Sequence, residues 1–176
     1  MNQRFLRGSL LSLTLLLGAC HSAYDTGFDA IIQTNRAAAN NLIRMAGDEI
    51  APGANIIAAS FADIDDLTRS SSFGRVASQQ LVSQLTEAGY AVKEMLLRDS
   101  VYISASQGEF LLSREISEIS TEHDAQAVLV GTYAVGENNV FVTARLIRTV
   151  DSVILASHDY AIPYTRDMRI LLRDWE

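Results

Sequence analysis

The sequence predicts a single α/β domain with a mixed sheet, in which an N-terminal helix precedes elements in the order β-α-β-α-β-β-β. Two short apolar runs, residues 55–61 and 90–97, flank an amphipathic helical stretch, as in a β-α-β unit. Residues 127–162 then hold three strand-like segments joined by short turns, the pattern of an antiparallel meander. Elements in this order are expected to form a sheet covered by helices.

The N-terminal helix is expected over residues 28–46. Thr26 and Asp29 resemble a capping box in its Asp variant, and Gly47 follows where the helix should end. A helix of this kind either packs on its own domain, the commoner arrangement, or faces a partner. Its apolar residues recur at helical spacing and form one stripe: Phe28, Ile31, Ile32, Ala39, Leu42, Ile43 and Ala46. Three asparagines fall outside this stripe or interrupt it: Asn35, Asn40 and Asn41.

The β-α-β unit begins after Pro52-Gly53, which breaks the chain ahead of the first strand. Serines 70–72 offer N-caps for a helix that runs to about Ala88, and Gly89 stands in the C′ position that favours glycine. The apolar stripe of this helix contains Phe73, Val76, Ala77, Leu81, Leu85 and Ala88. The run at residues 90–97 is the second strand.

The carboxyl half of the chain starts with a short helix that Ser113 can cap and that ends near His123. The three strands of the meander are expected at residues 127–135, 140–148 and 153–162, with turns at 137–139 and 151–152. In the middle strand, alternate residues share one apolar face: Val140, Val142, Ala144 and Leu146. A last helix after Thr165 carries the stripe Met168, Leu171, Leu172 and Trp175. Trp175 is either a core plug or a docking handle.

The first 20 residues have the layout of a bacterial lipoprotein signal peptide. Arg4 and Arg7 precede an apolar run at residues 10–17, which is too short to span a bilayer. The run ends in Leu17-Gly18-Ala19-Cys20, which matches a lipobox, the site of cleavage and acylation. An ordinary signal peptide that happens to contain a cysteine is the alternative. Cys20 is the only cysteine, so its acylation leaves no thiol for a disulfide, a metal or a nucleophile.

Lipid attachment at Cys20 predicts a lasting place at a membrane. One acyl chain holds a protein only marginally, whereas bacterial lipoproteins carry several chains, palmitate among them, on this cysteine. The next residue influences sorting in these proteins, and Asp there favours the inner membrane. Because His21 follows Cys20, we expect an outer-membrane lipoprotein that faces the periplasm.

The charge of the mature chain excludes nucleic acid as an expected partner. Removal of residues 1–19 takes away Arg4 and Arg7, so the net charge changes from −7 to −9. With a single lysine, Lys93, the chain is poorly suited to neutralising phosphates. The expected division is a signal peptide at 1–19, a lipidated tether with the N-terminal helix at 20–54, an α/β domain at 55–165, and a C-terminal helix at 166–176.

Few residue patterns suggest chemistry. Three carboxylates just after the first strand, on Asp63, Asp65 and Asp66, are of the type that binds divalent cations, but a solvated loop in which one aspartate caps a turn is the commoner arrangement. His123-Asp124 and His158-Asp159 place imidazole beside carboxylate, although neighbours in a strand point to opposite faces. Neither a G-x-S-x-G elbow nor a phosphate-binding glycine loop occurs. We therefore assign no catalytic, metal or cofactor residue and expect no small-molecule substrate.

Several blocks between residues 55 and 163 resemble the FlgO family of outer-membrane lipoproteins, named for members needed for flagellar motility. The matching blocks are residues 59–63, 97–103, 108–114, 127–133 and 142–146. A Gly-Thr-Tyr strand followed by an Ala-Arg-Leu strand is also similar, at fold level only, to periplasmic domains of curli-secretion and penicillin-binding-protein-activator lipoproteins. The FlgO resemblance implies a non-enzymatic structural or assembly role, with flagellar basal-body proteins or further copies of the chain as partners.

Two other functions stay open. An envelope lipoprotein of this kind can dock instead on a cell-wall synthase or a secretion channel. A periplasmic hydrolase built around one of the His-Asp pairs is the enzymatic alternative.

Overall fold

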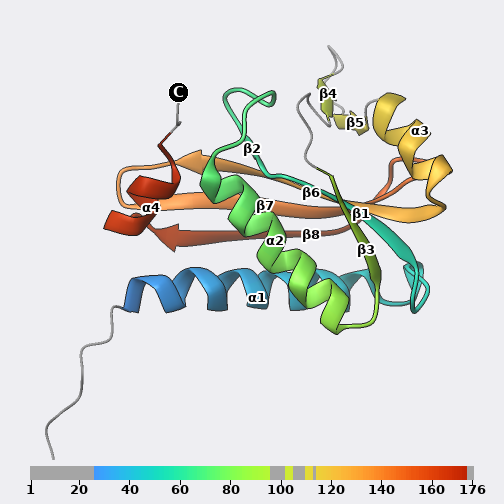
Figure 1. Cartoon of the computed structure of the whole chain (residues 1–176), viewed down its shortest axis with the longest axis horizontal. Coiled ribbons are helices and arrows are strands. Elements are labelled where there is room, and N and C mark those ends of the chain that lie inside the picture. Colours follow the sequence, from blue (N-terminus) through green and yellow to red (C-terminus); the bar gives the residue numbers. More distant parts are fainter. Residues whose placement is uncertain (1–25, 96–101, 105–109, 113, 174–176) are drawn as a thin grey trace, which may run out of the picture.

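The computed structural model describes residues 26–95, 102–104, 110–112 and 114–173, and their arrangement is shown in Figure 1. The helices are α1 (Thr26–Ala46), a 3-10 turn (Gly47–Glu49), α2 (Ser72–Glu87), α3 (Arg114–Glu122) and α4 (Arg166–Leu171). The strands are β1 (Asn55–Ala59), β2 (Ala62–Asp63), β3 (Ala91–Met95), β4 (Tyr102–Ser104), β5 (Phe110–Leu112), β6 (Ala125–Val135), β7 (Asn139–Arg148) and β8 (Ile154–Pro163).

The main sheet has the strand order β3-β1-β6-β7-β8, and the two-residue β2 also pairs with β6. Strands β3, β1 and β6 are mutually parallel, whereas β6, β7 and β8 form an antiparallel meander. The predicted fold class, a single α/β domain with a mixed sheet, is confirmed. Three features were missed: the 3-10 turn after α1, strand β2, and a separate antiparallel hairpin of β4 and β5 that interrupts the expected loop.

Side chains cap the first turns of α2 and α4, and the cap of α2 falls within the predicted serines 70–72. Ser71 caps α2 by accepting a hydrogen bond from the Gly74 backbone N–H at 3.3 Å, and Thr165 caps α4 through the Met168 N–H at 3.2 Å. Gly89 ends α2 with a φ of +95°, a backbone conformation that favours glycine. The expected caps at Thr26, Asp29 and Ser113 fall on side chains outside the described part, as does Trp175.

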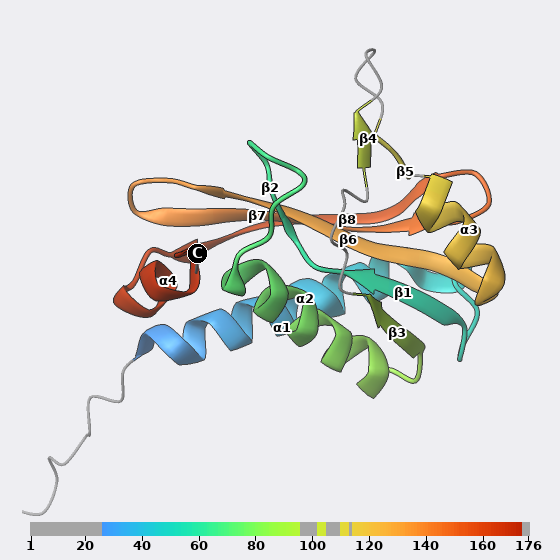
Figure 2. The same ribbon diagram turned by 45° about the horizontal axis from the view of Figure 1, so that its top comes forward.

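Helices α1 and α2 cover one face of the sheet, here called the inner face (Figure 2). Residues from both predicted stripes join the inward residues of β6, β7 and β8 in one buried cluster, so the N-terminal helix packs on its own domain; the Phe28 side chain lies outside the described part. The buried contributors from α1 include Ile31, Ala39, Leu42 and Ala46. Helix α3 lies on the opposite, outer face, where Ile119 packs on a smaller cluster around Ile57 and Val128.

Phe61, between β1 and β2, packs closely against α2 and β6. Its side chain is fully buried. A Cβ on Gly131 would lie 2.6 Å from the Phe61 ring, and a Cβ on Gly74 would lie 2.2 Å from the Phe61 carbonyl oxygen. Only glycine permits these approaches, which set the first turn of α2 directly against the segment between β1 and β2.

Candidate functional site

The residue predicted to carry the anchor, Cys20, lies outside the described residues. Six residue steps separate it from Thr26, the first residue of α1. Within the part that the structure describes, no helix combines the length and apolar character that crossing a bilayer requires.

The acidic loop after β1 has the hydrogen bonds of a series of turns. The carboxylate of Asp63 accepts a bond from the Asp65 N–H at 2.9 Å. The carboxylate of Asp66 accepts bonds from the Thr68 hydroxyl at 2.6 Å and from its N–H at 3.1 Å, and these bonds lower the pKa of Asp66. Aspartate side chains that bond the backbone two residues on are typical of turns. In the described ranges, no three His, Cys, Asp or Glu residues gather in a way that would hold a metal ion.

The pair His158-Asp159 lies on β8 and is split between the two faces of the sheet, as predicted. His158 is half-buried on the inner face, where its Nε2 lies 3.2 Å from Asn41 Nδ2 of α1. Asp159 is exposed on the outer face, opposite Thr143 of β7. The imidazole therefore belongs to the contact between α1 and the sheet.

The pair His123-Asp124 follows α3. In the structure, His123 contacts Lys93, a residue that the sequence did not indicate as its neighbour. Lys93 Nζ of β3 lies 2.5 Å from His123 Nε2, across 30 residues of chain. Asp124 has a φ of +48°, and its carbonyl oxygen accepts a bond from Asn55. Asn55, Lys93 and His123 line a cavity of about 310 Å³ at the amino ends of β1 and β3. No local sequence signal links Lys93 to His123, because only the sheet brings them together.

A buried polar contact joins α1 to β8 and α2. Asn35 is fully buried, yet its amide is satisfied on both sides. Its Nδ2 donates to Gln80 Oε1 at 2.6 Å, and its Oδ1 accepts a bond from the Tyr160 hydroxyl at 2.6 Å. Burial raises the pKa of the Tyr160 phenol. This contact holds α1 in one position on the sheet.

The outer face carries a row of exposed apolar residues at the end far from α3. Phe141 of β7 is 55% exposed and pairs with Ala134 of β6 and with Ala161 of β8. Ile64, 54% exposed, extends the row, since its N–H donates to the Tyr133 carbonyl oxygen at 3.0 Å. We call Ile64, Ala134, Phe141 and Ala161 the outer apolar row. A contiguous apolar surface of this kind marks a contact site more often than scattered exposed side chains do.

These observations define the class of protein: an α/β domain with α1 and α2 over one sheet face, and with α3 and an apolar row on the other. The chain belongs to the FlgO protein family, whose sequence profile matches residues 36–167. Family membership supports an envelope lipoprotein. No curated protein matches the chain.

Several solved structures are similar to this chain at low identity. The C-terminal domain of LpoB from Salmonella enterica superposes with a TM-score of 0.52 at 13% identity, covering 72% of this chain and 93% of that one. The same domain from Escherichia coli gives 0.48 at 15% identity, with coverages of 79% and 98%. Lipoprotein GNA1162 from Neisseria meningitidis gives 0.41 at 19%, with coverages of 65% and 83%. At these identities the likeness concerns the fold alone.

Proposed function

We propose that this chain is an outer-membrane lipoprotein, anchored through lipid on Cys20 and facing the periplasm, that serves as a structural or assembly component of the flagellar apparatus. Membership of the FlgO family over residues 36–167 is the observation that carries this proposal. The lipobox that ends at Cys20 supports the anchor, and His21 supports the choice of membrane.

The outer apolar row is the surface that this proposal assigns to the flagellar partner. It lies on the sheet face opposite α1 and α2, so a partner can reach Phe141 without displacing a helix. Burial of a large apolar side chain at an interface contributes about 1.5–3 kcal/mol. Replacement of Phe141 by serine should therefore weaken assembly while the inner core stays intact.

Swimming of a deletion strain tests the flagellar role. We expect the strain to lose motility, and wild-type protein or a Ser22→Ala control to restore it. Cys20→Ser and Phe141→Ser should both fail to restore swimming, whereas Val150→Ser, at an 85% exposed turn position, should succeed. Normal swimming of the deletion strain, with intact flagella, would favour an envelope lipoprotein that serves another periplasmic machine.

Separation of inner and outer membranes tests the anchor and its sorting. Wild-type protein should be found with the outer membrane, Cys20→Ser should appear in the soluble periplasmic fraction, and His21→Asp should move to the inner membrane. A Cys20→Ser protein that is released and still supports full swimming would show that the anchor is incidental.

A further inference from the structure

Helix α4 exposes a face that is rich in arginine. Arg166, Arg169, Ile170 and Arg173 are spaced at i, i+3, i+4 and i+7, so they lie on one side of the helix and the turn that continues it. All four are exposed, whereas Met168 is fully buried against the inner core. We call these four residues the arginine face.

Three arginines gather on one side of this segment in a protein that is acidic as a whole. Residues 164–176 hold three arginines and three acidic residues, so this segment has no net charge in a mature chain of net charge −9, and the arginines fall on one side of it. Among the described residues, Arg166 and Arg173 have no ion-pair partner, and the Arg169 guanidinium lies 5.9 Å from the centre of the Tyr164 ring. The guanidinium groups of this face therefore form no ion pair with another described residue, and all three side chains are exposed.

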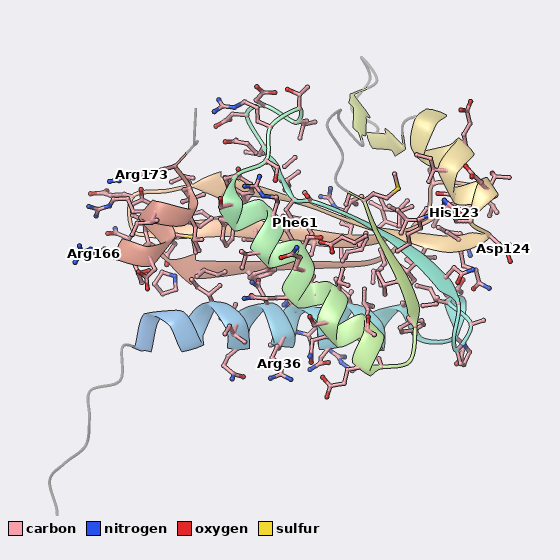
Figure 3. The ribbon with its side chains drawn as sticks, in the orientation of Figure 1. Arg36, Phe61, His123, Asp124, Arg166 and Arg173 are labelled. Carbon is pink, nitrogen blue, oxygen red and sulfur yellow. The ribbon has the colours of Figure 1, made fainter. Side chains whose placement is uncertain are left out.

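The arginine face lies at the end of the molecule where the proposed anchor enters. Figures 1 and 2 both place α4 at the same end as the first turn of α1. In Figure 3, Arg166 and Arg173 point outward past that end. Six residue steps from Cys20 to Thr26 span at most about 20 Å. An anchored chain would thus hold the start of α1, and the end that carries α4, near the membrane surface.

We propose that the arginine face docks on the anionic phospholipid headgroups of the membrane that holds the lipid anchor, an inference that rests on the proposed anchoring at Cys20. Guanidinium groups bind phosphate through paired hydrogen bonds, and Ile170 adds an apolar side chain suited to the headgroup boundary. The tether supplies a high local concentration of lipid, so a weak electrostatic contact suffices. Docking fixes the tilt of the domain relative to the membrane surface, and it therefore fixes the direction in which the outer apolar row faces.

The test uses the mature chain with an N-terminal polyhistidine tag in place of Cys20, held on vesicles by a nickel-chelating lipid. This tether works whether or not Cys20 is acylated in cells. Membrane fractionation therefore tests the lipid anchor, whereas the vesicle experiment tests the arginine face. Quenching of Trp175, the only tryptophan, by brominated lipids reports docking. One set of vesicles contains phosphatidylglycerol and phosphatidylcholine, and the other contains phosphatidylcholine alone.

We expect strong quenching of the wild-type chain on anionic vesicles, weak quenching on neutral ones, and loss of the difference in high salt. Each arginine near an anionic surface contributes roughly five-fold, so Arg166→Gln, Arg169→Gln and Arg173→Gln together should lower the ratio of docked to undocked protein on the order of a hundred-fold. The matched control replaces three other exposed arginines, Arg36, Arg44 and Arg75, by glutamine and should dock like the wild type.

Equal quenching of the wild type on both kinds of vesicle would overturn the proposal. Equal docking of the triple variant and the control would also overturn it. If the triple variant docks normally but loses swimming, the arginine face contacts an acidic protein surface instead of lipid. Circular dichroism of each variant verifies that the comparison is between folded chains.

Discussion

At the scale of single residues, Asn35 shows how a polar side chain can occupy the middle of an apolar interface. A buried amide without partners costs free energy, but Asn35 both donates to Gln80 and accepts from Tyr160. Both bonds can form only when α1 has one rotation about its axis and one position along the sheet. A purely apolar stripe would define that placement less well. The sequence pattern marked Asn35 only as an interruption, because its partners lie 45 and 125 residues away.

Replacement of Tyr160 by phenylalanine should destabilise the protein. The change removes the hydroxyl that donates to Asn35 Oδ1 and leaves a buried acceptor unsatisfied. We expect the free energy of unfolding, measured by urea denaturation, to fall by about 1–3 kcal/mol. Tyr164→Phe is the matched control, since no described hydrogen bond uses the Tyr164 hydroxyl. Equal stability of the two variants would contradict this account of the contact.

The same variant should also change how stability depends on pH. Burial raises the pKa of Tyr160 in the folded protein, so folding favours the neutral phenol. The stabilisation is fully present below the unfolded pKa of about 10 and is lost as the pH rises beyond it. Wild-type unfolding free energy should therefore fall above pH 10, and Tyr160→Phe should show a shallower fall. Parallel curves would argue against a buried phenol.

At the scale of elements, the local signals in the sequence were sufficient for the four described α-helices and for the long strands. Cap residues such as Ser71 and Thr165, and apolar periods of 3.6 and 2, act within a few neighbouring residues. Strands β2, β4 and β5 escaped prediction because runs of two or three residues are too short to show alternation. The contact of Lys93 with His123 and the surroundings of Asn35 depend on tertiary packing.

Helix α1 should be needed over its whole described length for a stable fold. The family match begins at residue 36, inside α1, and a chain that starts there loses Ile31, which is 2% exposed, together with Asn35. Loss of Ile31 burial alone should cost about 1.5–3 kcal/mol. We expect a chain of residues 36–173 to unfold at lower urea than one of residues 26–173. Equal midpoints would mean that the first half of α1 contributes nothing to the core.

At the scale of the whole molecule, the structure relates the anchor to the two exposed surfaces. Helix α1 has 21 residues and is about 30 Å long. Because α1 runs along the sheet, the domain extends from the proposed anchor over a similar distance. The arginine face lies near the start of this helix, and the outer apolar row lies on the sheet face that α1 does not cover. A short tether would hold the arginine face at the membrane and leave the outer apolar row open to a partner.

A longer tether should weaken docking without weakening attachment. Insertion of about 20 Gly and Ser residues between Ala23 and Tyr24 lets the domain explore more volume, so the effective concentration of headgroups at the arginine face falls on the order of ten-fold. Quenching of Trp175 on anionic vesicles should drop accordingly, while the tethered protein still sediments with the vesicles. Replacement of residues 21–25 by an equal number of Gly and Ser residues is the control and should retain docking. If the longer tether docked as well as the control, the contact would not depend on the tether, and the domain would bind the membrane by itself.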